Sequence, residues 1–181
     1  MDLETDIQVL DKQFELFLSN GTIHEKIATL AEAINRQFIG KELEIIIIME
    51  GAEAFANAII PLFNFSYNIH YQRIKSYIGM QSKGVLDFES EWISLLKQKE
   101  LLILEDIIDT GLTLNLFIKF LEENDIKKVY VASLLLKPAQ LKYELKPDFT
   151  GFEIGPEFII GFGMDYNEEG RQLSGIYRLK S

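Results

Sequence analysis

One stretch, residues 101–113, constrains the fold of this chain more than any other. Four apolar residues lead into two adjacent carboxylates, Glu105 and Asp106, and an amphipathic segment follows as far as Glu123. This order predicts a buried strand that ends at a compact loop and passes directly into a helix. The start of such a helix presents backbone N–H groups, and hydroxyls accompany them here, so the stretch suits a phosphate group.

The two acids next to this predicted phosphate site must bind something other than the phosphate, because a carboxylate cannot bind phosphate directly. Divalent cations and the hydroxyl groups of a sugar are the partners that carboxylates accept. A phosphate seat next to Glu105 and Asp106 therefore indicates a phosphorylated sugar that is handled with magnesium.

The rest of the chain alternates strands with helices. Apolar runs predict strands over 43–49, 65–77, 101–104 and 128–136, and helices over 51–62 and 113–123. Such alternation predicts an α/β fold, with a doubly wound, mainly parallel sheet flanked by helices and joined by right-handed crossovers. Ligands of such sheets lie at the carboxyl ends of the strands. Glu50, Gly51, the 105–113 run and Lys137 all follow strands, so we expect one shared site.

The two ends of the chain predict a small addition to this sheet. Helical spacing of apolar residues predicts a helix over 5–18, and the capping box Thr22-Ile-His-Glu25 opens a second helix that ends near Gly40. Residues 78–85 lack apolar periodicity and predict a loop. Proline and glycine break up residues 146–181. We therefore expect one domain, 1–181, with a hood subdomain formed by the N-terminal helix and about 146–181.

Composition excludes several classes of function. The chain has 48% hydrophobic and 25% charged residues, a net charge of −10, and no cysteine. An acidic chain is unsuited to general nucleic-acid binding, and without cysteine there is no disulfide, thiolate zinc site or cysteine nucleophile. His24 and His70 have no partner at metal-ligand spacing. Because we find neither a signal peptide nor a membrane-spanning run, we expect a cytoplasmic protein.

The chain also resembles a known family. Residues 101–113 are similar to the phosphoribosyl-diphosphate signature of type I phosphoribosyltransferases, which is an apolar strand, two acids, two apolar residues and Asp-Thr-Gly-x-Thr. Within that family the chain most resembles the hypoxanthine-guanine phosphoribosyltransferases. The supporting stretches are Lys75-Ser-Tyr77 of the catalytic flap, 131–137 with its purine-binding lysine, 146–154, and 157–168 followed by Arg171.

This resemblance implies an activity in purine salvage. The family moves phosphoribose from 5-phosphoribosyl 1-diphosphate to hypoxanthine or guanine, giving IMP or GMP and pyrophosphate. Breaking the bond at the anomeric carbon develops oxocarbenium character, as in glycoside hydrolysis. By resemblance Glu105 and Asp106 hold the ribose hydroxyls directly and through Mg²⁺. The loop residues Ile108, Asp109, Thr110, Gly111, Leu112 and Thr113 hold the phosphoribose.

The purine half of the site is implied in the same way. Asp109 is the expected general base for the purine ring proton, and a helix N-cap is its alternative role. Lys137 is expected to donate to the 6-oxo group, in preference to Lys146, and Phe158 to stack on the ring. The remaining expected purine contacts are Ile107, Glu157, Ile159 and Asp165. A lysine donor favours a 6-oxopurine over adenine, so transfer to adenine or a pyrimidine is the less favoured reading.

Further residues complete the expected cleft. Glu50, Gly51 and Arg171 are expected at the pyrophosphate, Asp165 at a second Mg²⁺, and Ser76 and Tyr77 in a flap that excludes water. The resemblance also implies a homodimer or homotetramer that binds purine nucleotides.

Two positions depart from the family pattern. After the first strand the family usually has lysine and glycine, with an unusual cis peptide bond, whereas this chain has Glu50-Gly51. Between Gly111 and Thr113 the family often has a polar residue, and this chain has Leu112. Glu50 leaves open a non-catalytic alternative, in which the fold senses a nucleotide or phosphoribosyl diphosphate. The acidic chain argues against a DNA-binding regulator, and Asp109 favours catalysis.

Overall fold

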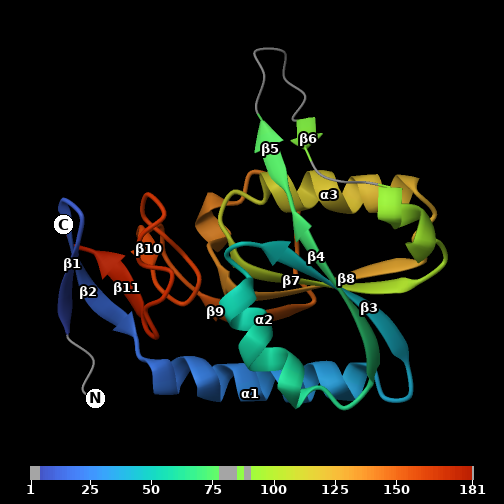
Figure 1. Cartoon of the computed structure of the whole chain (residues 1–181), viewed down its shortest axis with the longest axis horizontal. Coiled ribbons are helices and arrows are strands. Elements are labelled where there is room, and N and C mark those ends of the chain that lie inside the picture. Colours follow the sequence, from blue (N-terminus) through green and yellow to red (C-terminus); the bar gives the residue numbers. More distant parts are fainter. Residues whose placement is uncertain (1–4, 78–84, 88–90, 181) are drawn as a thin grey trace.

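A five-stranded sheet forms the centre of the computed structural model, which describes residues 5–77, 85–87 and 91–180 (Figure 1). Its strand order is β4-β3-β7-β8-β9, and all neighbouring pairs are parallel. The strands are β3 (Glu42–Met49), β4 (Ser66–Arg73), β7 (Glu100–Ile108), β8 (Lys128–Leu136) and β9 (Phe149–Glu153). This is the mainly parallel α/β sheet that the alternation predicted.

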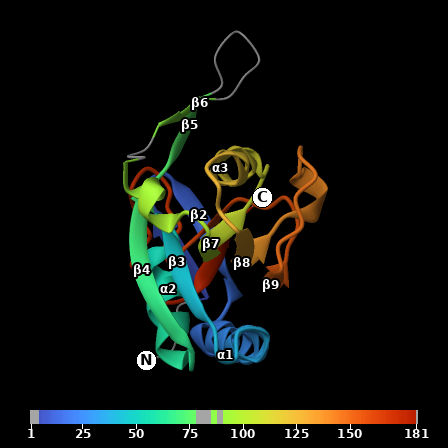
Figure 2. The same cartoon turned by 90° about the vertical axis from the view of Figure 1, so that its right-hand side faces the viewer.

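Helices cover both faces of this sheet (Figures 1 and 2). The helices are α1 (Asn20–Gln37), α2 (Glu53–Ile59) and α3 (Leu112–Glu123), with short 3₁₀ turns at Ile60–Leu62, Glu91–Leu96 and Pro138–Gln140. Leu43, Ile45 and Ile47 of β3 pack with α1 and α2, whereas Ile46 and Ile48 pack with α3. Because side chains alternate along a strand, an unbroken apolar run such as β3 can serve two cores.

A second sheet brings the two ends of the chain together. Its order is β1-β2-β11-β10, with antiparallel pairing. The strands are β1 (Asp6–Val9), β2 (Lys12–Leu18), β10 (Ile159–Ile160) and β11 (Ile176–Leu179). Strand β9 lies within the stretch assigned to the hood, but it pairs with β8 in the main sheet.

The helix expected over 5–18 is wrong, because this stretch is the β1–β2 hairpin, in which Ile7 pairs with Phe14. The prediction was wrong because the helical spacing counted Leu10 among the residues of a buried face. Leu10 lies at the turn with a φ of 52°, and its side chain is 51% exposed instead of facing a core. The following helix also begins earlier than the capping box indicated. Ser19 is its N-cap and accepts a hydrogen bond from the Thr22 amide.

A second correction concerns β7. We expected this strand to end at Leu104 and the acids to lie in a loop, but the strand continues through Glu105 and Asp106 to Ile108. Beyond β4, strands β5 (Lys75–Tyr77) and β6 (Val85–Asp87) form an antiparallel pair that extends away from the sheet (Figures 1 and 2). The loop expected over 78–85 lies outside the described residues, except Val85, which begins β6. None of the described helices is long and apolar enough to cross a membrane.

Candidate functional site

The candidate site lies where β3, β7 and β8 end. Glu50 follows β3, Asp109 follows β7 and Lys137 follows β8. Two cavities open there, and Ile107 and Asp109 line both of them. The carboxyl ends of these parallel strands therefore border two adjoining cavities, although Glu50 and Gly51 are not among the residues that line them.

The first cavity, of about 130 Å³, is built from one continuous stretch of chain. Its lining residues are Glu105 and 107–114. Gly111 occupies the N-cap position of α3 with a φ of 75°, a left-handed conformation that glycine adopts without steric cost. The Thr110 hydroxyl accepts from the Leu112 amide at 3.4 Å. Gly111, and not Asp109, is thus the N-cap of α3. The first turn of this helix borders the cavity.

The second cavity, of about 220 Å³, is assembled from distant parts of the chain. Its lining combines the end of β7 and Lys137 with residues near the C-terminus, namely Asp106, Ile107, Asp109, Lys137, Phe158, Ile159, Met164, Asp165 and Arg171. Most of these residues were expected at the purine or the pyrophosphate. Met164 was missed, because an apolar residue in a glycine-rich stretch carries no functional signal.

The acids of β7 face different compartments. Glu105 lines the first cavity and Asp106 the second, as expected for neighbours in a strand, whose side chains point to opposite faces. Glu105 Oε2 is enclosed and has no hydrogen-bond partner among the described residues. Asp106 is buried, and its Oδ1 accepts from the Ile107 amide at 2.8 Å.

Burial shifts the protonation of both acids. It raises the pKa of Glu105 well above the ordinary value, and the charge of Asp106 adds to this effect. Burial also raises the pKa of Asp106 to about 6, although the Ile107 amide and the Arg171 charge act in the opposite direction. Desolvation of a carboxylate is costly unless a cation or a set of donors compensates it. This acidic pair therefore suits an external ligand that brings positive charge or hydroxyl groups.

Asp109 and Lys137 form an ion pair in the lining of the second cavity, and Asp109 also lines the first. Lys137 Nζ donates to Asp109 Oδ2 at 2.8 Å, and the side chains are 6% and 45% exposed respectively. The Lys137 backbone N–H donates to the Ile108 carbonyl at 2.9 Å, which fixes the end of β8 beside the end of β7. A buried donor thus lies next to a carboxylate that remains accessible to a ligand.

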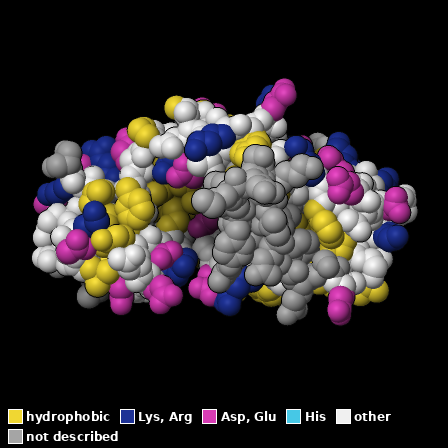
Figure 3. Space-filling view, turned by 90° about the horizontal axis from the view of Figure 1, so that it is seen from above, with side chains coloured by type: hydrophobic (Ala, Val, Ile, Leu, Met, Phe, Trp, Pro, Cys, Tyr) yellow, Lys and Arg dark blue, Asp and Glu magenta, His cyan; other side chains and the backbone are white. Residues whose placement is uncertain are grey.

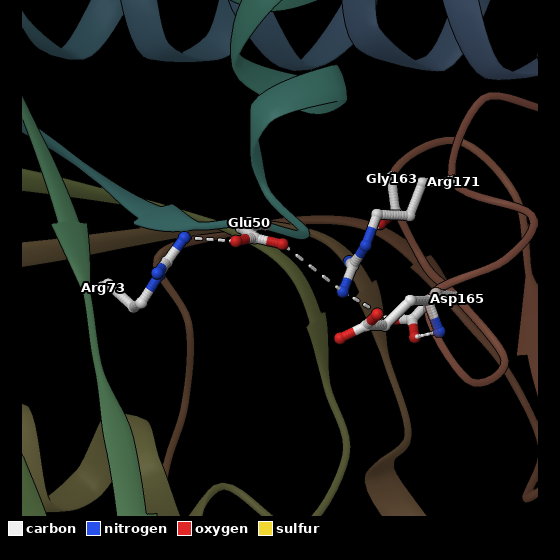
Figure 4. Close-up of polar contacts among 6 residues, drawn as sticks. Glu50, Arg73, Gly163, Asp165 and Arg171 are labelled. Atoms are coloured by element: carbon white, nitrogen blue, oxygen red, sulfur yellow. Dashed lines mark hydrogen bonds and ion pairs between the residues drawn. The ribbon is translucent and has the colours of Figure 1, made fainter.

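A network of carboxylates and arginines borders the second cavity (Figure 4). Arg171 Nη2 lies 2.7 Å from Asp165 Oδ1 and 3.9 Å from Glu50 Oε2. Arg73, from the end of β4, donates to Glu50 Oε1. Sequence reasoning placed Glu50, Asp165 and Arg171 in the cleft but missed Arg73. Arg73 carried no functional signal, because it lies inside the strand predicted over 65–77, whereas β4 ends at this residue in the structure.

Close backbone packing explains the glycine after Glu50. A Cβ atom on Gly51 would lie 1.9 Å from Asp106 Oδ2, so any other residue would displace this acid. Gly163 approaches from the other side, and a Cβ there would lie 2.1 Å from the Gly51 carbonyl oxygen. The peptide bond between Met49 and Glu50 is cis. The Glu50-Gly51 backbone is therefore held between β7 and the loop that carries Arg171.

Phe158 lies at the border with the second sheet. The residue is 44% exposed, and its ring centroid lies 6.4 Å from that of Phe14 and 5.9 Å from that of Tyr166. Figure 3 shows hydrophobic side chains gathered at the end of the molecule that holds this smaller sheet, next to a hollow. Glu157 is not among the residues that line the cavity, and its Oε2 is enclosed without a hydrogen-bond partner in the described chain.

The flap residues are described only in part. Ser76 pairs with Leu86, and Tyr77 with Val85, in the β5–β6 pair. Their side chains lie outside the described part of the structure. The expectation that these two residues close over the reacting centre stays a prediction.

Comparison with known proteins agrees with this architecture. A family model described as a phosphoribosyl transferase domain matches residues 17–167. The chain is 37% identical to the hypoxanthine-guanine-xanthine phosphoribosyltransferase of Plasmodium falciparum, over 88% of this chain and 74% of that protein. It is 35% identical to the hypoxanthine-guanine phosphoribosyltransferase of Lactococcus lactis, over 94% of each protein.

Solved structures give the same result. A crystal structure of a hypoxanthine-guanine phosphoribosyltransferase from Bacillus anthracis superposes with a TM-score of 0.82 at 29% identity. The superposition covers 92% of this chain and 97% of the crystallised chain.

Proposed function

Because this chain belongs to the type I phosphoribosyltransferases, in their hypoxanthine-guanine group, we propose that it makes IMP or GMP for purine salvage. The substrates are 5-phosphoribosyl 1-diphosphate and hypoxanthine or guanine, and pyrophosphate is the second product. The observation that carries the proposal is the pair of adjoining cavities that share Ile107 and Asp109. A transferase that joins two substrates needs two such compartments in contact.

The first cavity is proposed to hold the phosphoribose. Amides of the first turn of α3, with the hydroxyls of Thr110 and Thr113, receive the 5′-phosphate. Gly111 lets the backbone approach the phosphate closely, and Ile108 and Leu112 contribute backbone groups. Glu105 of β7 lines this cavity and Asp106 lines the adjoining one, and the two carboxylates accept hydrogen bonds from the ribose hydroxyls between them.

The second cavity is proposed to hold the purine. A 6-oxopurine presents a carbonyl acceptor beside a ring N–H, and the Asp109–Lys137 pair presents the complementary donor and acceptor. Lysine has three N–H donors, so Lys137 can keep its bond to Asp109 and donate to the 6-oxo group. The second oxygen of Asp109 accepts the ring proton as transfer proceeds. A 6-amino group would face the Lys137 donors, which disfavours adenine.

Other residues of this compartment hold the base and the leaving group. Phe158 stacks on the ring, and Ile107, Glu157 and Ile159 supply backbone groups to its edge. Arg171 holds the pyrophosphate with its guanidinium group, together with the Glu50-Gly51 backbone. Ser76 and Tyr77 exclude water from the oxocarbenium-like state.

The acids of the cleft fit Mg²⁺. The unpartnered Glu105 oxygen and the raised pKa of Asp106 indicate a place that lacks positive charge. Among the described residues no three ligating side chains converge on one point, so Glu105 and Asp106 would hold one Mg²⁺ and Asp165 a second one, with ligands from water and the substrate completing each site. When bound, Mg²⁺ neutralises the diphosphate leaving group. We also infer a cytoplasmic homodimer or homotetramer.

One assay tests the proposed function. The protein is incubated with Mg²⁺, 5-phosphoribosyl 1-diphosphate and hypoxanthine, guanine or adenine in turn, and nucleotide formation is followed by chromatography. We expect IMP and GMP, and no AMP. If no nucleotide forms with any purine, the proposal is wrong, and the non-catalytic role of a nucleotide-sensing protein takes its place.

A further inference from the structure

The Glu50 carboxylate lies between two arginines, one of which, Arg171, lines the second cavity. Its Oε1 accepts from Arg73, and its Oε2 lies 3.9 Å from Arg171 Nη2. Figure 4 shows the carboxylate between the two guanidinium groups, which approach it from opposite sides. Guanidinium groups also bind phosphate through charge-assisted hydrogen bonds, so the two arginines that face Glu50 are suited to a phosphate group as well.

The two arginines differ in how firmly they are held. Arg171 contacts Asp165 at 2.7 Å and donates to the Gly163 carbonyl at 2.8 Å, so its position does not depend on Glu50. Glu50 is the only ion-pair partner of Arg73 in the described chain. Its register places Arg73 opposite Met49, next to the Glu50 backbone. Arg73 is thus a cation beside the cleft whose charge is taken up by Glu50.

Solvent exposure makes this contact exchangeable. The side chains of Glu50 and Arg73 are 45% and 61% exposed, and exposed ion pairs contribute little to stability. A diphosphate carries more negative charge and more acceptor oxygens than a carboxylate, so it competes well for two guanidinium groups. The Glu50 backbone stays in place during such an exchange, because Gly51 is held between Asp106 and Gly163.

We propose that Arg73 is a second diphosphate-binding residue, after Arg171. In the ligand-free protein the Glu50 carboxylate occupies the position between these two arginines that the diphosphate takes when it binds. Glu50 competes with the diphosphate for the two arginines, so it weakens binding of the substrate and hastens release of pyrophosphate. The inference rests on the proposed function, because it deepens the role of the same cleft.

Titration calorimetry with inorganic pyrophosphate and Mg²⁺ tests this inference without any turnover. E50Q keeps the size of the side chain and removes its charge, so we expect the Kd for pyrophosphate to fall by about threefold to tenfold. R73Q should raise this Kd by about tenfold. In the double variant E50Q/R73Q, the decrease in Kd caused by E50Q should be smaller, because Glu50 no longer has Arg73 to compete for.

A matched control comes from the second sheet. Glu15 and Arg178 form a half-exposed pair at 2.6 Å, and E15Q removes the same charge away from the cleft. We expect E15Q to leave the Kd unchanged. A higher Kd in E50Q would mean that Glu50 only positions the arginines, and an unchanged Kd in R73Q would exclude Arg73 from the seat. Either result overturns the inference, as does a lack of pyrophosphate binding in the wild type and E50Q alike.

These outcomes are separable from failure of the proposed function. If no nucleotide forms but the Kd values shift as expected, the diphosphate seat stands and the transferase activity does not. If IMP forms at normal rates while E50Q binds pyrophosphate less tightly, the activity stands and the role of Glu50 falls.

Discussion

The acids in this cleft form two groups that differ in whether the chain supplies their cation. Glu50, Asp109 and Asp165 each pair with an arginine or a lysine at the rim. Glu105 and Asp106 have no ion-pair partner within the described residues, and burial raises the pKa of both. At Glu50, Asp109 and Asp165 a ligand must therefore replace or share an existing ion pair. At Glu105 and Asp106 a ligand instead supplies the positive charge or the hydrogen-bond donors that offset the cost of burying two carboxylates.

Substitution of Asp109 should have the largest effect. D109N retains the shape of the side chain and cannot take up the purine proton, so we expect the turnover number to fall by at least about 100-fold. The KM for 5-phosphoribosyl 1-diphosphate and the melting temperature should change little. Steady-state kinetics with hypoxanthine measures this, with D125N at an exposed site as the control. Near-normal turnover in D109N would remove Asp109 from the role of general base.

Substitution of Lys137 should act mainly on purine binding. K137Q removes the charge that faces Asp109 and weakens donation to the 6-oxo group, so we expect the KM for hypoxanthine to rise by about tenfold to 100-fold. The KM for the phosphoribosyl donor should remain close to that of the wild type. K146Q is the matched control, since Lys146 is the competing candidate from the sequence. If K146Q has the larger effect, the assignment of the purine donor is reversed.

Substitution of Asp106 should have a smaller effect on stability than the two substitutions above have on activity. It should increase the stability of the ligand-free fold. The folded pKa of about 6 exceeds the ordinary value, so ionisation destabilises the ligand-free fold as the pH rises from about 4 to above 6. D106N avoids this cost and should increase the free energy of unfolding at pH 7.5 by about 1–3 kcal/mol. The gain should shrink at pH 4.5, where the folded wild type, like folded D106N, is largely uncharged at this position.

Urea unfolding of the wild type and D106N at the two pH values measures this difference. D125N serves as the control for loss of an exposed acid, and we expect its stability to track that of the wild type. A D106N protein that is less stable than the wild type at pH 7.5 would mean that the fold already compensates the Asp106 charge.

The difference between the groups also explains what the sequence could predict. The phosphoribose seat is local, because the β7–α3 connection follows from one run of residues. That Asp109 and Lys137 line one cavity agrees with the rule that ligands lie at the carboxyl ends of parallel strands. Contacts between side chains of distant segments did not follow, so the Arg73–Glu50 and Asp109–Lys137 pairs had to come from the structure.

Two errors have the same origin. Charged residues usually mark the end of a buried strand, yet Glu105 and Asp106 lie within β7 because β8 pairs alongside it as far as Ile108. The β1–β2 hairpin was read as a helix because local spacing does not reveal pairing with β11. In both cases a tertiary partner decides the local structure.

The most direct test of the account is the thermal stabilisation that 5-phosphoribosyl 1-diphosphate and Mg²⁺ produce together at pH 7.5. We expect a clear rise in the melting temperature of the wild type and of E15Q, since a ligand that binds only the folded state stabilises it. In E105Q/D106N the rise should be lost or strongly reduced, because the unpaired acids that receive the ion and the ribose are gone. An equal rise in all three proteins would contradict the claim that the β7 acids form the ligand seat.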